Sequence, residues 1–404
     1  MFCQYYTIDD KQTNMKIQKI FIGGWYQRTT LHLSEIYDFL QDAASPLALD
    51  RKKLRSLRDR LQPTSVEMRI RELEYICLKT KNGIETNIFE DGLIVLGKPV
   101  RKIEDDILAI TEFHEKNLSP ALNYLFSLGA PVPKELANIA TVYPYFILLQ
   151  NAKPTEINLL LKKLGQKKYF EIKKPEFEIY RGDKIYLINN IKEDDRVITR
   201  LINEQIFVRE FKIQLHRYLN LHRIIWEKIA AIKERGEIRG REAGPLKTQL
   251  EGYSKTINLI DSRINQMNVY LGTREKIVKN DPQLKKITSI IEFKYETLND
   301  TLSYVKELWV MTKNYVDSSL SLFAAIQAKS TEASIKNLTI ITVTGVTATF
   351  LKLFSGDLPK FTTSGLVYFL ILIFVGSSAD AIIRIISRRK KYKIKEALIN
   401  KDIN

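Results

Sequence analysis

Short runs of two alternating patterns fill the first half of the chain. Period-two alternation of apolar and polar residues predicts strands over 16–22, 66–80, 84–97, 169–172, 176–180 and 184–188, and the apolar run 145–150 predicts a buried strand. Apolar residues at intervals of three and four predict helices over 35–40, 46–61, 105–128 and 155–164. Residues 15–192 are therefore expected to form one α/β domain on a mostly antiparallel sheet, after a polar extension over 1–14.

Glycine and proline mark the expected ends and turns of these elements. Gly23-Gly24 predicts the end of the first strand, and Pro120 predicts a kink in the helix over 105–128. Asn82-Gly83 lies between two strand-like runs and predicts a hairpin turn, because both residues adopt positive φ readily.

From residue 193 to residue 336 the strand signals give way to long helical stretches, here called the stalk. One helix is expected over 197–235, with breaks at Gly236, Gly240 and Gly244-Pro245, and a second over 246–272. A third is expected to begin at Asp281-Pro282, with the aspartate as N-cap and the proline in the first helical position.

The third stalk helix has the longest regular pattern in the chain. Its apolar residues recur at three- and four-residue intervals from Leu284 to Ile326, and no proline or glycine occurs between 283 and 343. A helix of about sixty residues is roughly 90 Å long, and it needs packing partners along its whole apolar face. Those partners are either the other two stalk helices alone or, in addition, copies of the same chain.

Two apolar runs near the C-terminus predict a membrane hairpin. Residues 338–351 carry no charge, and a second run over 365–379 extends to 386 if Asp380 and Arg384 pair across one helical turn. The expected spans are 337–354 and 365–386, joined by a short outer loop over 355–364 that contains Pro359.

The distribution of lysine and arginine orients this hairpin. A basic cluster over 388–395 follows the second span within the tail 388–404, whereas Asp357 and Lys360 cancel in the outer loop. The positive-inside rule then places both termini in the cytoplasm. The chain is accordingly expected to be a multi-pass protein of the plasma membrane whose bulk is cytoplasmic.

The first span has a stripe of hydroxyl and aliphatic residues. Leu338, Thr342, Val346, Thr349 and Leu353 advance by four, four, three and four and therefore share one helix face. The threonines are either packing groups that bond back to their own helix or the lining of a pore. One hairpin cannot enclose a pore, but a ring of hairpins can.

Composition narrows the function classes. The 404 residues carry a formal net charge of +16, which favours an anionic partner, either membrane lipid, nucleic acid or a nucleotide. Two distant cysteines and four scattered histidines give no metal spacing or disulfide framework, and no phosphate loop or nucleophile motif is present. We expect that the chain is not an enzyme and that it has no resident cofactor, no DNA partner and no signal peptide. Either Met1 or Met15 is expected to be the first residue.

The turn 235–241 is basic. It is expected to be either a solvated tip of a helical hairpin or an anion-binding loop.

The order of these parts, with Lys336-Asn337-Leu338-Thr339-Ile340-Ile341 at the start of the first span, resembles the CorA superfamily of divalent-cation channels and transporters. The resemblance implies a funnel-shaped homopentamer. It also implies a pore lined by the stripe from Leu338 to Leu353 and a divalent cation such as Mg²⁺ as the transported ion.

One departure bears on selectivity. The family carries Tyr-Gly-Met-Asn in its outer loop, and this chain reads Ser355-Gly356-Asp357-Leu358 there. Only Gly356 matches, so Asp357 becomes the expected cation-attracting group at the outer mouth, where a carboxylate ring attracts cations without reading the water shell of Mg²⁺. The departure and the basic charge favour an alternative: a CorA-like membrane effector gated by a cytosolic nucleotide signal, as in antiviral defence. The sequence does not locate a ligand site.

Overall fold

The computed structural model describes residues 16–25, 32–125, 144–354, 391–393 and the single positions 367, 370, 374, 378, 385 and 389. The chain forms two compact units. Unit 1 contains residues 1–219 and 262–306, and unit 2 contains residues 220–261 and 307–404. Each of the three long helices contributes a segment to both units.

A nine-stranded sheet is the centre of unit 1, in the order β2-β3-β4-β5-β1-β6-β9-β8-β7. All neighbours are antiparallel except β6 and β9, which confirms the expected mostly antiparallel sheet. The strands are β1 (Lys16–Trp25), β2 (Pro63–Arg69), β3 (Tyr75–Thr80), β4 (Glu85–Phe89), β5 (Leu93–Pro99), β6 (Tyr145–Gln150), β7 (Phe170–Lys173), β8 (Phe177–Arg181) and β9 (Ile185–Asn190).

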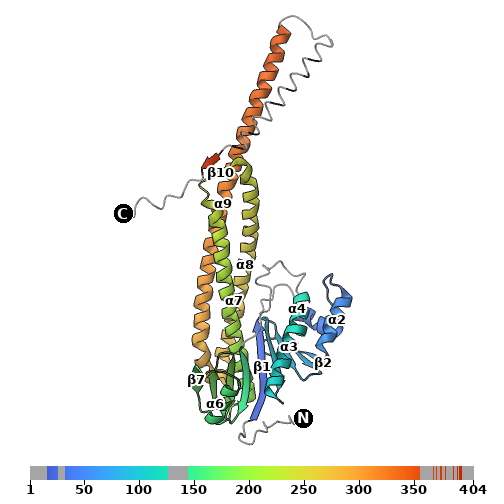
Figure 1. Ribbon diagram of the computed structural model, residues 1–404, viewed down its shortest axis with the longest axis vertical. Helices are drawn as coiled ribbons and strands as arrows, with labels where there is room; N and C mark the ends of the chain where they lie inside the picture. Colours follow the sequence, from blue (N-terminus) through green and yellow to red (C-terminus); the bar gives the residue numbers. More distant parts are fainter. Residues whose placement is uncertain are drawn as a thin grey trace, which may run out of the picture. The chain divides into compact units, whose positions relative to one another are not determined.

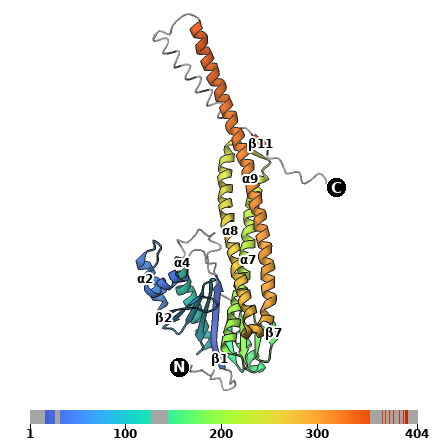
Figure 2. The same cartoon turned by 180° about the vertical axis from the view of Figure 1, so that it is seen from behind.

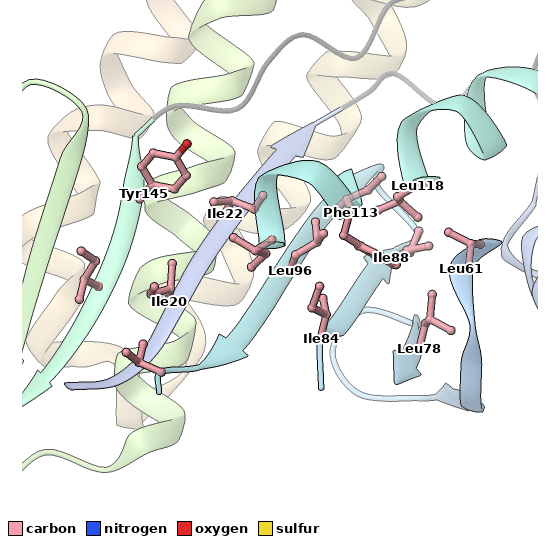
Figure 3. Packing of buried hydrophobic residues seen from close by; sticks show 14 of the residues in the cluster. Ile20, Ile22, Leu61, Leu78, Ile84, Ile88, Leu96, Phe113, Leu118 and Tyr145 are labelled. Carbon is pink, nitrogen blue, oxygen red and sulfur yellow. The ribbon is translucent and has the colours of Figure 1, made fainter. Parts of the chain in front are cut away.

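Short helices cover one face of this sheet. They are α1 (Leu33–Asp42), α2 (Arg51–Leu61), α3 (Ile103–Glu112), α4 (Ser119–Leu125) and α6 (Pro154–Lys163). Alternate strand residues such as Ile20, Ile88 and Leu96 point toward them and are essentially inaccessible to solvent (Figure 3). This continuous apolar layer is the core of the α/β domain.

The first strand does not end at Gly23-Gly24, as the sequence suggested, but continues to Trp25. A Cβ on Gly23 would lie 2.6 Å from the backbone oxygen of Ile94 and 2.8 Å from the side chain of Ile206. The glycine is therefore needed for the close approach of a helix to the strand, not for a strand end.

The predicted hairpin is present, but its turn differs from the expected type. Gly83 has a φ of +73° and Asn82 does not have a positive φ. The amide of Gly83 donates to the oxygen of Thr80, and the amide of Thr80 donates to the oxygen of Ile84. This is a three-residue connection with the glycine in the left-handed position. The two long runs around it divide into the four strands β2 to β5.

The helix expected over 105–128 is divided at the predicted proline. A π-helical turn, η1 (Phe113–Leu118), joins α3 to α4 just before Pro120. The wider turn fits the missing amide hydrogen of the proline, which cannot continue the regular bonding ladder. His114 lies in this turn, buried, with its Nδ1 atom unpartnered.

Three long helices follow the sheet (Figures 1 and 2): α7 (Asp195–Lys233), α8 (Gly240–Asn280) and α9 (Lys285–Phe354). The predicted break after the first long helix is confirmed at Gly236, because α7 ends at Lys233 and α8 begins at Gly240. Its predicted continuation to Gly244-Pro245 is wrong, because α8 includes Pro245. Ala243, Leu246 and Leu250 are buried there, and packing of an apolar face outweighs local helix propensity. A 3-10 turn, Pro282–Leu284, precedes α9, where an N-cap at Asp281 was expected.

Within unit 2, α7 and α9 are joined by aromatic contacts. The rings of Trp226 and Tyr315 stack at 4.5 Å, and the ring of Trp309 meets His222 edge-on at 5.6 Å. The ammonium group of Lys233 lies 4.2 Å from the centre of the Tyr315 ring. These contacts fix the register of the two helices in this unit.

The basic turn between α7 and α8 is a strand in unit 2. Strand β10 (Glu237–Arg239) pairs antiparallel with β11 (Lys391–Lys393), which belongs to the C-terminal tail. Ile238 is buried, and Lys391 Nζ lies 2.8 Å from Glu237 Oε2. The sequence offered a solvated tip or an anion-binding loop, and the structure adds a third role, the anchoring of the tail.

The buried His114 predicts acid sensitivity of the α/β domain. Burial lowers the pKa of His114 to about 4, whereas an unfolded histidine titrates near 6.5. Below pH 6.5 the unfolded chain takes up the proton first, so stability present at pH 7 is lost as the pH falls toward 4. We expect about 2 kcal/mol less stability at pH 5 than at pH 7 from this residue. In urea unfolding, His114→Leu should abolish that part of the difference, and exposed His32→Leu should leave it unchanged.

Candidate functional site

The predicted pore stripe lies on the last turns of α9. Leu338, Thr342, Val346, Thr349 and Leu353 all have helical backbone, so they share one face of that helix. The side chains of Thr342 and Val346 are exposed. The predicted outer-mouth residues Gly356 and Asp357 lie outside the described residues, so their role as a cation-attracting group stays a prediction.

Among the described residues, no helix combines the length and the apolar character that a membrane crossing requires. The second predicted span, 365–386, falls outside the described part of the chain except at five single positions, 367, 370, 374, 378 and 385. The membrane hairpin therefore stays a prediction.

Unit 1 contains a polar cavity that the sequence did not indicate, here called the arginine pocket. It encloses about 280 Å³, near the lower limit of the ~300–1,000 Å³ typical of small-molecule sites. Strands β2 to β4 form one wall and the first turns of α7 form the other. Its lining consists of Arg69, Arg71, Glu72, Leu73, Tyr75, Glu85, Asn87, Phe89, Asp195, Arg196, Thr199, Arg200 and Asn203.

Strand alternation brings the sheet residues into this pocket. Tyr75 lies opposite Phe89, and Cys77 lies opposite Asn87, so these side chains share the sheet face away from the apolar core. Toward the middle of the sheet the same face carries Trp25, which packs against Phe207 and Phe211 of α7. The polar lining thus continues a face that is apolar where α7 covers it.

The first turns of α7 supply the opposite wall. Arg196, Thr199, Arg200 and Asn203 recur at intervals of three, one and three, so they lie on one side of the helix. Arg196 is exposed, the Arg200 side chain is 16% exposed, and Asn203 is buried.

Four polar atoms of the pocket residues are buried and have no hydrogen-bond partner. They are Arg200 Nε, Arg200 Nη2, Asn203 Oδ1 and Asn87 Oδ1. Arg200 Nε lies 2.9 Å from Glu204 Oε1, close enough for an ion pair but without hydrogen-bond alignment. Buried polar atoms are normally satisfied, so this group of donors and acceptors is suited to a polar ligand.

A buried ion cluster lies behind the Arg200 wall. Arg274 of α8 donates through Nη1 to Glu204 Oε1 at 3.0 Å and through Nη2 to Asp91 Oδ1 at 3.1 Å, and its Nε donates to the other Asp91 oxygen. The hydroxyl of Tyr295 on α9 donates to Glu204 Oε2. We call these four residues the Arg274 cluster. It joins the sheet, through Asp91, to all three long helices.

The charges in the cluster support each other. Burial alone would lower the pKa of Arg274, but the carboxylates of Asp91 and Glu204 raise it above its usual value. Burial and the Glu204 carboxylate raise the pKa of Tyr295 well above its usual value. The arginine therefore stays charged and the tyrosine stays a hydrogen-bond donor at any physiological pH.

The charges of the pocket lining are partly neutralised at its rim. Arg69 pairs with Glu67 at 2.7 Å. Glu85 pairs with Lys19 at 3.1 Å, and although burial alone would raise the pKa of Glu85, the charge of Lys19 lowers it. The other charged residues of the lining are the arginines Arg71, Arg196 and Arg200 and the carboxylates Glu72 and Asp195, so positive charge is in slight excess.

Within the part of the chain that the structure describes, no three His, Cys, Asp or Glu side chains gather closely enough to hold a metal ion. Residues 69–89 and 195–203 are far apart in the sequence, so no local motif marked the site. The available signal was Glu85 and Asn87 at alternate positions in β4, on a face where the neighbouring strand β5 carries Leu93 and Val95.

Comparisons with known proteins add little. No protein-family model matches the chain, and no curated protein matches it. Among solved structures, the soluble domain of CorA from Methanocaldococcus jannaschii is similar over 46% of this chain and 88% of that chain, at 12% identity and a TM-score of 0.19. A score this low carries no argument, so the resemblance to the CorA superfamily rests on the sequence pattern.

The Arg274 cluster makes a prediction about stability. Arg274→Met leaves two buried carboxylates without their cation, and we expect a loss of about 3–5 kcal/mol in the free energy of unfolding. The matched control is Lys279→Met on the same helix, which removes exposed ion pairs with Glu275 and Glu292 and should cost less than about 1 kcal/mol. Urea unfolding followed by circular dichroism measures both. Equal losses would mean that the cluster does not hold the unit together.

Proposed function

We propose that this chain is a subunit of a homopentameric cation channel of the CorA type in the plasma membrane, with both termini in the cytoplasm. The supporting observation is helix α9, which runs for 70 residues from Lys285 to Phe354 without a break. Its length is about 105 Å. In this proposal the same helix that packs in the cytosolic α/β unit continues without interruption into the first span and carries the pore stripe.

In this proposal the stripe from Leu338 to Leu353 lines the pore. Rings of threonine hydroxyls at 342 and 349 lower the cost of passing a hydrated cation, and rings of leucine at 338 and 353 form narrow apolar gates that close by dewetting. Asp357 forms a carboxylate ring at the outer mouth that concentrates cations with little preference among them. The chain is not an enzyme and needs no resident cofactor; a divalent cation such as Mg²⁺ is cargo.

A second candidate function is a channel gated by a cytosolic anionic ligand such as a nucleotide. The observation that favours it is the arginine pocket, because its four arginines attract an anion and four buried polar atoms of Arg200, Asn203 and Asn87 have no hydrogen-bond partner. Both candidates share one pore and differ in whether a ligand is needed to open it.

The oligomeric state tests the first candidate. Val310 and Met311 of α9 are 45% and 47% exposed in a single chain, and a neighbouring copy would cover such residues. Native mass spectrometry of the detergent-solubilised protein should give five copies. Val310→Glu with Met311→Glu should shift the population toward smaller species, and Lys306→Glu, an exposed residue on the same helix, is the control. A stable wild-type monomer would remove the pore proposal.

Cation flux into liposomes tests the pore assignment. Asp357→Asn should reduce flux at low ionic strength more than at high, because salt screens the ring of charge, with a Debye length of about 10 Å at 0.1 M. Leu338→Asn should raise leak, because a polar ring stays wet. Ser355→Asn is a loop control with no expected effect. If flux is the same in Asp357→Asn as in the wild type at every salt concentration, the outer-mouth assignment is wrong.

A further inference from the structure

We propose that the arginine pocket binds a small phosphorylated ligand of the nucleotide class, and that the ligand takes Arg200 away from Glu204. The inference rests on the proposed ligand response of this site and adds the ligand class, the residues that recognise it and the contact through which binding is transmitted. All of these residues belong to unit 1.

The phosphate position follows from Arg200. Its Nη2 is buried and unpartnered, and its Nε reaches Glu204 without hydrogen-bond alignment. A guanidinium group favours two parallel hydrogen bonds to a phosphate, which its present contact with Glu204 does not supply. Arg196 lies one turn earlier on the same side of α7 and is exposed at the pocket. Unlike Arg200, it does not have to give up a contact with Glu204 in order to bind a phosphate. The pair therefore forms a two-arginine phosphate site.

The two asparagines require a ligand with hydrogen-bond donors as well as charge. Asn87 Oδ1 on β4 and Asn203 Oδ1 on α7 are both buried and unpartnered, and both are acceptors. Inorganic phosphate in its charged form offers them few hydrogen-bond donors. Ribose hydroxyls and the exocyclic amine of a base do offer such donors, so the opposite walls of the pocket select an organic phosphate.

The aromatic residues and the volume narrow the ligand further. Tyr75 stacks on Phe89 at 5.1 Å, and the Arg274 guanidinium lies 5.5 Å from the centre of the Phe89 ring. Tyr75, which is 7% exposed, is the aromatic side chain of the lining that we assign to contact a flat ring. A cavity of about 280 Å³ suits one mononucleotide unit, either free or as one end of a larger molecule.

The contact between Arg200 and Glu204 gives ligand binding a route to the helices. Glu204 Oε1 is shared by Arg200 of α7 and Arg274 of α8, and its Oε2 accepts from Tyr295 of α9. When a phosphate takes Arg200, Glu204 loses one of its two cations and is left to Arg274 and Tyr295. Ligand binding in the pocket thereby changes the ionic contacts of the Glu204 carboxylate, which residues of all three helices contact.

Calorimetry on the full chain in detergent tests the ligand class with three probes: AMP, adenosine and inorganic phosphate. We expect AMP to bind at least ten-fold more tightly than either of the other two. If inorganic phosphate binds as tightly as AMP, the pocket does not recognise the nucleoside. If adenosine binds as tightly as AMP, the pocket does not recognise the phosphate. Either result would overturn the proposal.

Variants test the location. Arg196→Met, an exposed change that does not disturb folding, and Arg200→Met should each weaken AMP binding by ten-fold or more, and Asn203→Leu should weaken AMP but not phosphate. Arg55→Met on α2, an exposed arginine outside the pocket, is the matched control and should bind as the wild type does. Unchanged AMP affinity in Arg196→Met and Arg200→Met would place the ligand elsewhere and overturn the proposal.

Hydrogen exchange tests the transmission and separates this inference from the channel. AMP should alter amide exchange by at least two-fold around residues 200–206 and 270–298 in the wild type, and in Glu204→Gln the effect beyond α7 should be lost. Unchanged exchange around 270–298 in the wild type would overturn the transmission step.

Liposome flux separates the two proposals. If AMP binds and alters exchange but does not change liposome flux, the pocket assignment is supported and the ligand-gated channel is wrong. If flux is present but AMP does not bind, the pocket assignment falls and the channel stands.

Discussion

One buried arginine holds unit 1 together. Arg274 is 1% exposed and pairs with Asp91 from the sheet and with Glu204 from α7. The hydroxyl of Tyr295 on α9 donates a further hydrogen bond to Glu204. Buried charges are tolerable only when their partners are in place. The positions of the β4–β5 turn and of the three helices are therefore set jointly, and a shift in any one of them exposes an uncompensated charge to a low-dielectric interior.

The candidate site is a direct consequence of this arrangement. Because Glu204 is satisfied by Arg274 and Tyr295, Arg200 is needed only weakly and retains an unpartnered nitrogen at the pocket. A polar group that is held in place but not saturated is preorganised for a ligand. The same carboxylate thus serves stability through Arg274 and is open to regulation through Arg200, so an anion at the pocket acts on the most buried ionic contact in the unit.

Two features relate the helices to the predicted membrane hairpin. Helix α9 carries the chain without a break from residue 285 to residue 354. The pairing of β10 with β11 attaches the tail, at residues 391–393, to the connection between α7 and α8. If the hairpin spans the membrane as proposed, both of its cytosolic ends are then tied to the helices, one by helix continuity and one by a short sheet.

The sequence by itself determined the features that depend on local spacing. Period-two alternation located most of the strands, Asn82-Gly83 marked the hairpin, and Pro120 marked the division of a helix. The absence of proline and glycine between 283 and 343 predicted the long third helix. Tertiary structure decided whatever depends on residues distant in sequence. Gly23 permits the close approach of Ile206, and the buried packing of α8 keeps it helical at Pro245. The arginine pocket forms only where β2 to β4 meet the start of α7. Local patterns encode periodicity and turn geometry, but whether Arg200 and Asn203 find partners depends on which side chains from other elements the fold brings beside them, and no spacing along the chain records that.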